Sequence, residues 1–286
     1  MKKSNRIMTI VLAVILIATS LFAFAGCGKP YYSVRYQAIA IEGIPKTEYV
    51  MCVSKAVPDG QEILNALNKV IKEEAAAIVE SNISPTGRGG FAKSANEKNK
   101  NMSEDTAVIF YIQLYDPFTC APLGGGEYGV GIDVDIAYKV AHSLDRRASF
   151  MYGPIDFSMT RVKDGHAHVL AQAIPYSKEL EKDFYVSEVY ATGSQSILSN
   201  SRQKFDELAD LGGLVIGVIE GRPGQKLVED AVANGVLKDT GAVIRYYDTD
   251  TEVKNAFLQN NIDVAVLDEF PAKITAQYLG TKYIFR

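Results

Sequence analysis

Apolar positions recur with two different periods along this chain, and the changes of period outline alternating strands and helices. From Ile132 to Leu144, apolar residues recur at helical spacing and predict a helix. The preceding segment, 115–131, is rich in glycine, including Gly124, Gly125 and Gly126, and predicts a loop. Because a short apolar stretch at 107–114 comes before this loop, we interpret 107–144 as the opening βα unit of an α/β domain.

The same alternation continues to the C-terminus. A first series follows the opening unit, with strands at 148–152 and 168–174 and a short helix at 157–163. After a crossing strand at 187–198, a second series is predicted, with strands at 214–219, 242–247 and 264–267 and helices at 225–233, 252–259 and 271–279. Strands separated by helices of this length predict mostly parallel sheets with ligand sites at the carboxyl ends of the strands.

Upstream of this region the pattern predicts strands at 31–42 and 49–53, followed by a helix with one apolar face. That face consists of Ile63, Leu64, Leu67, Val70 and Ile71. Asp59 and Glu62 stand where they would cap the helix. The next segment, 81–105, is dominated by Gly, Ser, Asn and Lys and has little to bury, so we predict a poorly ordered flexible linker.

The N-terminus has the pattern of a lipoprotein signal peptide covering residues 1–26. Three basic residues in the first six positions precede an apolar run at 7–25, and the sequence Ala-Gly-Cys ends at Cys27. We expect Cys27 to be lipidated and to hold the protein at the extracytoplasmic face of the cell membrane, on the cell surface or in the periplasm. An uncleaved membrane anchor is the alternative.

The charge balance after removal of residues 1–26 is acidic. Loss of three of the 30 basic residues leaves 27 against 34 acidic ones, a formal net charge of −7. With no basic run, this balance argues against a nucleic-acid partner. Besides Cys27 the chain has only Cys52 and Cys120, too few for a disulfide scaffold, although one bridge between them stays open.

The histidines show no metal-ligand spacing, and we interpret them as ordinary surface or strand residues: His142, His166 and His168. Neither a metal nor any other cofactor is therefore expected.

Several segments between Tyr115 and Tyr278 carry a family resemblance. YDPF from Tyr115, followed by GEYGVGIDVDIAYKVA, resembles the family-3 solute-binding proteins of ABC importers, the amino-acid-binding class. The match continues through IDFSMTRVKDGHAHVLAQAIPYSKE, VSEVYATGSQSILSN and FDELADLGGLVIGVIEGRPGQ, and ends with NNIDVAVLDEFPAKITAQY near Tyr278. The resemblance implies a type II periplasmic-binding-protein-like α/β fold, in which two lobes joined by a hinge close on a ligand like a Venus flytrap.

The order of the segments departs from the family. EYVMCVSKAVPDGQEILNALNKVIKEE, at 48–74, resembles the family's closing segment but precedes its opening one, and the chain ends where the family continues into that segment. We interpret this as a circular permutation, with a truncated tandem protein as the alternative. Lobe 1 is then 50–190, including the flexible linker 81–105, and lobe 2 combines 31–49 with 191–286.

Five residues are candidates for ligand binding: Tyr115, Phe157, Gln172, Arg222 and Asp268. The resemblance implies roles for Tyr115, Phe157 and Asp268, whereas Gln172 and Arg222 lie where the chain departs from the family. Tyr115 and Phe157 match aromatic positions that sandwich the ligand, with ordinary packing as the alternative for each. Asp268 matches the carboxylate that binds the ligand's ammonium group, and its alternative role is to cap the helix that begins near Pro271.

The departures concern the carboxylate side of the ligand. Leu180 and Ser177 stand where the family has an arginine and a threonine, and Pro175 lacks a backbone N–H. Losing one partner of a buried charge pair costs about 3–5 kcal/mol, so we do not expect an ordinary α-amino acid bound in the ordinary way. Arg222, in a GRPG run that replaces the family's G-T-T, would supply the missing charge if it points inward; a solvent-facing arginine is the alternative.

We therefore expect a lipid-anchored, monomeric solute-binding protein that captures a small polar, amino-acid-like or amine-containing ligand for an ABC permease. Two other functions stay open. One is an orphan sensor or interaction lipoprotein with a degenerate cleft, which Leu180 and Pro175 suggest. The other is a dehydratase-like enzyme on the same fold, with Glu179 and Glu220 as acid–base candidates. No catalytic signature accompanies them, so we expect a protein that is not an enzyme.

Overall fold

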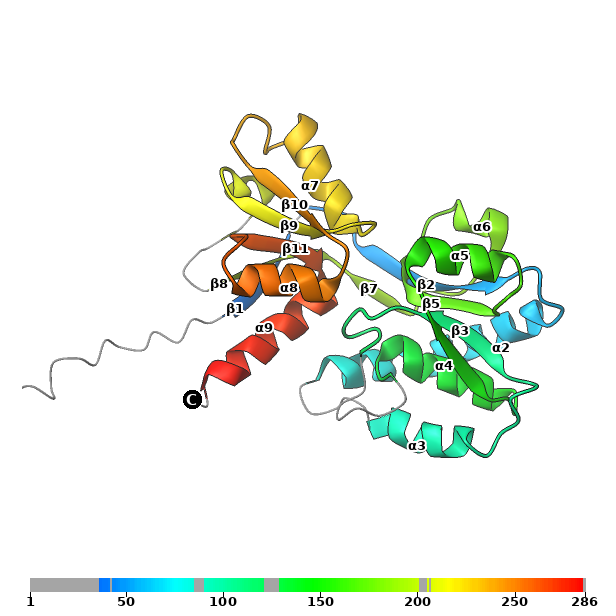
Figure 1. The fold of residues 1–286 in the computed structure, drawn as a ribbon. Coiled ribbons are helices and arrows are strands. Elements are labelled where there is room, and N and C mark those ends of the chain that lie inside the picture. The colour runs from blue at the N-terminus through cyan, green and yellow to red at the C-terminus, as the bar shows by residue number, and fades with distance from the viewer. Residues whose placement is uncertain are drawn as a thin grey trace, which may run out of the picture. The chain divides into compact units, whose positions relative to one another are not determined.

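The computed structural model of the chain describes residues 36–41, 43–84, 90–120, 129–200, 205 and 207–284. These residues contain two β-sheets with helices packed against them (Figure 1). The predicted signal peptide, Cys27 and the three consecutive glycines from Gly124 lie outside the described residues. None of the helices in the described part combines the length and the apolar character needed to cross a membrane.

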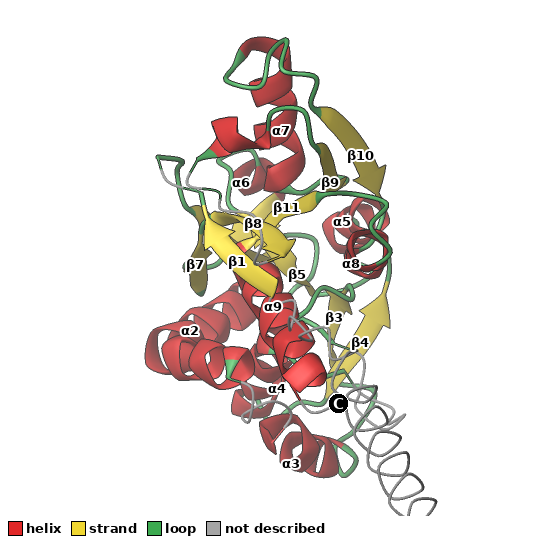
Figure 2. Ribbon diagram, turned by 90° about the vertical axis from the view of Figure 1, so that its left-hand side faces the viewer, coloured by secondary structure: helices red, strands yellow, loops and turns green. Residues whose placement is uncertain are grey.

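Six strands form one sheet: β2 (Thr47–Ser54), β3 (Val108–Ile112), β4 (Ala148–Tyr152), β5 (Val169–Pro175), β6 (Phe184–Val186) and β7 (Ala191–Gly193). Their order is β4-β3-β5-β2-β6, and β7 also pairs with β2. The helices of this part are α2 (Gly60–Ile83), α3 (Gly90–Asn99), α4 (Ile132–Ser143), α5 (Ile155–Lys163) and α6 (Leu180–Asp183). Figure 2 shows α2, α3 and α4 as neighbouring helices.

Five strands form the other sheet: β1 (Tyr36–Ala40), β8 (Gln195–Asn200), β9 (Val215–Ile219), β10 (Val243–Tyr247) and β11 (Val264–Asp268). Their order is β1-β8-β11-β9-β10. A short 3₁₀ helix (Leu208–Leu211) precedes β9, and the α-helices here are α7 (Pro223–Asn234), α8 (Asp250–Leu258) and α9 (Glu269–Ile284). The chain passes from this sheet to the six-stranded one between Ala40 and Thr47, and returns between Gly193 and Gln195.

The predicted α/β alternation is confirmed, but the prediction of mostly parallel sheets was wrong. Strands separated by a helix do pair in parallel, as β3 does with β4 and β9 does with β10. Antiparallel pairs arise where a strand enters a sheet without a crossover helix. Thus β2 pairs antiparallel with β5, and β8 pairs antiparallel with both β1 and β11. Both sheets are therefore mixed.

The N-terminal segment provides part of the core of the six-stranded sheet. Tyr49, Met51 and Val53 of β2 are fully buried, and β2 lies between β5 and β6. The predicted apolar face of α2 is buried against α4, with Ile63 and Leu67 completely inaccessible. Burial of such a face is the main source of stability for a helix in a globular protein. Residues 47–83 and 108–186 therefore form one folded unit although a connecting segment separates them.

The prediction of a flexible linker at 81–105 was wrong for its described residues. α2 continues to Ile83, and Gly90–Asn99 forms α3. Ala92 and Ala95 of α3 are buried, so even its few small apolar side chains suffice when the helix packs on α4. Asn99, the last residue of the helix, binds the backbone of Ala148: Nδ2 donates to the carbonyl oxygen at 2.9 Å, and Oδ1 accepts from the N–H at 2.7 Å.

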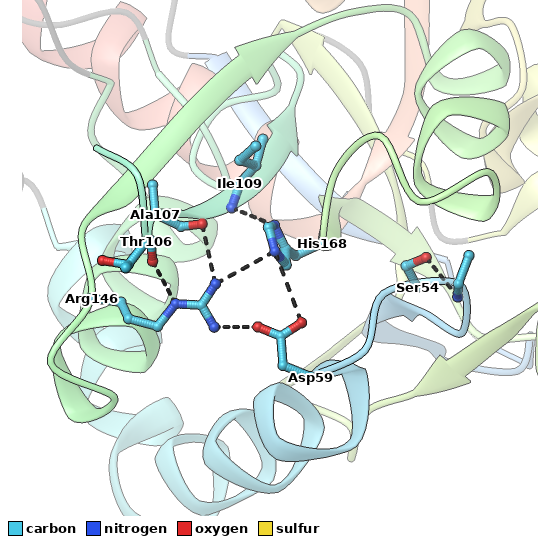
Figure 3. A network of polar contacts seen from close by, with 8 residues as sticks. Ser54, Asp59, Thr106, Ala107, Ile109, Arg146 and His168 are labelled. Atoms are coloured by element: carbon cyan, nitrogen blue, oxygen red, sulfur yellow. Dashed lines mark hydrogen bonds and ion pairs between the residues drawn. The ribbon is translucent and has the colours of Figure 1, made fainter. Parts of the chain in front are cut away.

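Asp59 does not cap α2, as the sequence suggested it would. Its side chain accepts no hydrogen bond from the helix backbone and instead forms an ion pair with Arg146 (Figure 3). Arg146 also donates hydrogen bonds to the backbone carbonyls of Thr106 and Ala107, at 2.6 and 3.2 Å. Although burial opposes the shift, the hydrogen bond and charge of Arg146 lower the pKa of Asp59. The beginning of α2 is thereby attached to the segment that leads into β3.

His168 belongs to the same network and is not an isolated surface residue. Its Nδ1 accepts a hydrogen bond from the N–H of Ile109 at 3.0 Å, which leaves Nε2 to carry the proton of the neutral ring. Burial lowers the pKa of His168, with the charge of Arg146 acting in the same direction and Asp59 opposing it. No group of His, Cys, Asp and Glu side chains in the described part has an arrangement that could hold a metal ion.

We predict that Asn99→Ala destabilises the protein by about 1–3 kcal/mol, because it leaves the buried polar backbone groups of Ala148 without their side-chain partner. Urea unfolding followed by circular dichroism measures the change. The control is Asn101→Ala, which removes one exposed bond, from Nδ2 to the carbonyl of Glu97. Equal unfolding free energies for the two variants would show that α3 is not anchored through Asn99.

Candidate ligand-binding site

Tyr115 is positioned by a turn that begins soon after β3. The N–H of Phe118 donates to the carbonyl of Tyr115 at 2.8 Å, and the last two carbonyls of the YDPF turn accept from the N–H groups of Ile132 and Asp133 at 3.0 and 2.9 Å. These donors open α4, so the turn satisfies N–H groups that a helix start leaves unpaired. Gly131 has φ +137°, and a Cβ there would lie 2.7 Å from a carbonyl oxygen of the turn. This close approach explains the glycine before the helix.

The hydroxyl of Tyr115 donates a hydrogen bond to Oδ2 of Asp268, the last residue of β11. Oδ1 of Asp268 accepts from Nε2 of Gln195, at the start of β8. Both Tyr115 and Asp268 are almost fully buried. Burial first, and then the charge of Asp268, raise the pKa of Tyr115 well above its usual value, so this phenol remains a donor. The bond joins the loop after β3 to a strand of the other sheet.

The alternative role of Asp268, as a helix cap, is not what the structure shows. Its carboxylate accepts hydrogen bonds from the side chains of Tyr115 and Gln195 rather than from the N–H groups of α9. The next residue, Glu269, accepts a hydrogen bond from the N–H of Ser194 at 2.8 Å and pairs with Lys273 one turn along the helix. Asp268 therefore directs its charge into the buried cluster.

Arg222 points inward, which was one of the two orientations left open by the sequence. Gly221 has φ +74°, a turn conformation that favours glycine, and α7 begins at Pro223, so Arg222 is held in extended backbone between them. Its side chain is only 9% exposed. The Cζ atom lies 3.9 Å from the centroid of the Tyr115 ring, and Nη1 donates to the carbonyls of Gln172 and Ala173 at 3.2 and 3.0 Å.

Gln172 and Phe157 occupy different positions from the other three candidates. The side chain of Gln172 is buried and donates to the carbonyl of Gly153 at 3.1 Å and to Oγ of Ser158 at 2.9 Å, so only its backbone reaches Arg222. The Phe157 side chain is 52% exposed and packs edge-to-face on Tyr111 at 6.1 Å. The structure thus brings Tyr115, Arg222 and Asp268 together and leaves Phe157 outside their cluster.

The sequence interpretation missed Asp133, which binds the same residue of β5, Ala173, as Arg222 does. Its carboxylate accepts hydrogen bonds from the hydroxyl of Tyr190 at 2.6 Å and from the N–H of Ala173 at 2.9 Å. Burial raises the pKa of Asp133 to about 7, and these two bonds and the charge of Arg222 oppose the rise. An acidic residue between Ile132 and Val134, in the first turn of a helix whose residues are mostly buried, was an available signal. Gln195, by contrast, gave no such signal in the crossing strand.

A small cavity, about 30 Å³, lies beside Tyr115 and Arg222. Three acidic residues also line it: Glu220, Asp248 and Asp250. This volume suits a group about the size of a water molecule and not a whole amino acid. A wider groove, about 430 Å³, lies between α2, α3 and α4, and none of the five candidate residues lines it.

The two cysteines in the described part are separate. Cys52 is fully buried in β2, and burial raises the pKa of its thiol to about 12. Cys120 donates a hydrogen bond from its thiol to Oδ1 of Asp116 at 3.1 Å. No disulfide joins them, so the bridge that the sequence left open is not formed.

Two mixed β-sheets, each covered by helices and with aromatic and charged residues at their junction, have the architecture of a periplasmic binding protein. The family comparison agrees: the family described as bacterial extracellular solute-binding proteins, family 3, matches residues 108–281. This chain belongs to that family.

The chain is similar to the histidine-binding periplasmic protein of Salmonella typhimurium, with 20% identity over 159 residues. That match covers 54% of this chain, and the chain spans 59% of the length of this curated relative.

Solved structures show the same fold at low sequence identity. An ancestral arginine-binding protein bound to arginine has a TM-score of 0.54 and 21% identity, with 60% of this chain and 74% of that chain covered. An amino acid ABC transporter substrate-binding protein from Streptococcus pneumoniae, bound to L-arginine, has a TM-score of 0.52 and 16% identity, with 61% and 72% covered. The type II periplasmic-binding-protein fold class is thereby confirmed.

We predict that Asp133 makes stability fall with rising pH. Its pKa is about 7 in the folded protein against an ordinary value of 3.8, so the folded state binds the proton more tightly. The contribution of Asp133 to the free energy of unfolding is a few kcal/mol. It is fully present below about pH 4 and is lost as pH rises through about 7. Urea unfolding of wild type and Asp133→Asn between pH 4 and 8 should show the unfolding free energy of wild type falling relative to that of the variant over this window.

The control for this measurement is Asp230→Asn, which changes an exposed carboxylate on α7 that pairs with Lys226. It should follow the wild-type pH profile. A constant difference between wild type and Asp133→Asn across the window would contradict the role given to Asp133.

Proposed function

We propose that this protein is an extracytoplasmic solute-binding protein that captures a small polar, amino-acid-like or amine-containing solute for an ABC permease. The observation that carries the proposal is the buried cluster of Tyr115, Arg222 and Asp268, which links elements of the two sheets. A carboxylate and a guanidinium on one aromatic ring offer partners for the ammonium and carboxylate groups of such a solute. The names of relatives, which include histidine-binding and arginine-binding proteins, support a solute of this class.

In this proposal each candidate residue has a distinct role. Asp268 binds the ammonium group, Tyr115 forms an aromatic wall, and Arg222 binds the carboxylate. Leu180, at the position of the family's arginine, is buried in an apolar cluster at the start of α6 and offers no charge. The carboxylate partner would therefore have moved to Arg222. Two further contacts, from Phe157 and Gln172, would come from the α5 side of the site.

We also propose the lobes and the circular permutation inferred from the sequence. Lobe 1 comprises 50–190, and lobe 2 comprises 31–49 with 191–286. The family match begins at residue 108, yet β2 and α2 from the N-terminal segment complete the sheet that residues 108–186 build. A closing segment moved to the front of the chain accounts for both facts.

An orphan sensor or interaction lipoprotein is the second candidate. The small cavity and the bonds of Arg222 to the carbonyls of β5 favour it, because the protein's own side chain fills space between the sheets. For the enzyme alternative, Glu179 is exposed and pairs with Lys182, so it is poorly placed as a buried acid or base.

Lipid anchoring at Cys27 predicts that the wild-type protein sediments with membranes and incorporates a fatty-acid analogue. Cys27→Ser should lose the label, because the acceptor thiol is gone. Fractionation with click-chemistry labelling in a bacterial host measures both. The control, Cys120→Ser, should retain the label. Unlabelled wild type that still sediments with membranes would favour an uncleaved anchor.

Solute capture predicts a stabilising ligand in a thermal-shift panel of amino acids, amines, polyamines, dicarboxylates and short peptides. A solute at 100 times its dissociation constant adds about 2.7 kcal/mol to the unfolding free energy. For an amine ligand, Asp268→Asn should weaken binding by about two to four decades, because it removes one partner of a buried charge pair. Asp230→Asn is the control and should bind normally. Silence across the panel would favour the sensor or interaction alternative.

A further inference from the structure

Strand β5 carries an irregularity at the point where Arg222 reaches it. Between two regular pairs of β5 with β2, residues 171–173 stand opposite the single residue Met51. Ala173 has φ +49°, a left-handed conformation that residues other than glycine rarely adopt. Successive carbonyls of a regular strand point to opposite sides, but here those of Gln172 and Ala173 both accept from Nη1 of Arg222. The bulge therefore turns two consecutive carbonyls toward one donor.

The backbone between these two carbonyls is also held by residues on the six-stranded side of the molecule. The N–H of Ala173 donates to Oδ2 of Asp133 at 2.9 Å, and the other oxygen of Asp133 is held by Tyr190 at 2.6 Å. Asp133 and Tyr190 are fully or almost fully buried. Because these bonds do not involve Arg222, the peptide unit that carries the Gln172 carbonyl is oriented by residues from the six-stranded side alone. Bulges of this kind occur next to binding sites, where they redirect polar groups.

The aromatic face opposite the carbonyl pair is equally fixed. Tyr115 stacks on Phe118 with nearly parallel rings, 5.8 Å apart at 6°, and its hydroxyl is held by Asp268. The guanidinium of Arg222 lies over the ring at 3.9 Å. A flat, delocalised cation with a fork of donors suits a ring face beside two acceptors better than a compact ammonium does.

We propose that the carbonyls of Gln172 and Ala173 and the ring of Tyr115 form a guanidinium-binding site, and that Arg222 is its tethered occupant. Tyr115, Gln172 and Ala173 belong to β5 and the loop after β3, whereas Arg222 follows β9 of the other sheet. The contact therefore holds the two sheets together while no solute is bound. The inference rests on the proposed function in one respect: a solute whose carboxylate takes Arg222 must first displace it from these carbonyls.

The test is chemical rescue in full-length protein purified in detergent. Arg222→Ala should lower the melting temperature and speed hydrogen exchange in peptides that cover 169–175 and 215–225. Methylguanidinium at millimolar concentration should reverse at least half of both changes in a saturable way, because it refills the site. Methylammonium, which has the same charge but no planar fork, should reverse much less. Wild type should not respond, since Arg222 already occupies the site.

Two variants control this test. Arg245→Ala removes an exposed arginine that donates to the carbonyl of Asn261 at 2.7 Å, and it should show no response to methylguanidinium. Adding Tyr115→Leu to Arg222→Ala should abolish the rescue, because it removes the ring. Absence of rescue in Arg222→Ala, or an equal effect of both cations, would overturn the proposal.

If Arg222→Ala does not fold, Arg222→Lys decides the question. It keeps the charge and loses the fork, so exchange in the two peptide regions should be faster than in wild type. Unchanged exchange would overturn the tethered-arginine proposal. No solute is present in any of these measurements. Failure of the rescue therefore does not contradict the proposed solute capture, and a thermal-shift panel without a binding solute does not contradict the guanidinium site.

Discussion

The buried carboxylate of Asp268 is the constraint on which the junction of the two sheets depends. A charge at this depth is costly unless hydrogen bonds satisfy it, and Asp268 obtains them from Tyr115 and Gln195. One of these partners comes from the six-stranded side of the molecule and the other from the neighbouring strand β8. Separating the sheets would therefore expose the carboxylate to water or to a ligand cation. This property is what the proposed capture of a solute between the sheets would require.

The second organising feature is the contribution of the N-terminal segment. β2 lies inside the six-stranded sheet rather than at its edge, and Tyr49 near its start packs against both Phe118 and Phe270. Phe270 belongs to α9, near the other end of the chain. Residues far apart in sequence thus share one apolar core. A strand in this position cannot be removed without opening the sheet, so the N-terminal segment is an integral part of this sheet.

Much of the fold was predictable because burial of one face of a helix or strand requires apolar residues at regular spacing in the sequence. Strand β4 was predicted with its exact residues, and α2, α4 and α7 were predicted from the spacing of their apolar residues. The antiparallel pairs were not predictable in this way, because alternation shows that a strand is half-buried but not which neighbour it has. The order of α3 was missed for a related reason: its few alanines are buried only because α4 provides a surface, and Asn99 finds its partner on a distant strand.

For the site, the sequence by itself determined the kinds of residue and the family. It named Tyr115, Asp268 and Arg222 as candidates, and the family resemblance implied that Leu180 stands where the family has an arginine. Only the tertiary structure decided that Arg222 points inward and binds carbonyls of β5, and that Asp133 supports the bulge at Ala173. The physical reason is that composition and spacing record which groups a chain carries, whereas direction and partner depend on backbone conformations, such as the left-handed Ala173, that form when distant segments pack together.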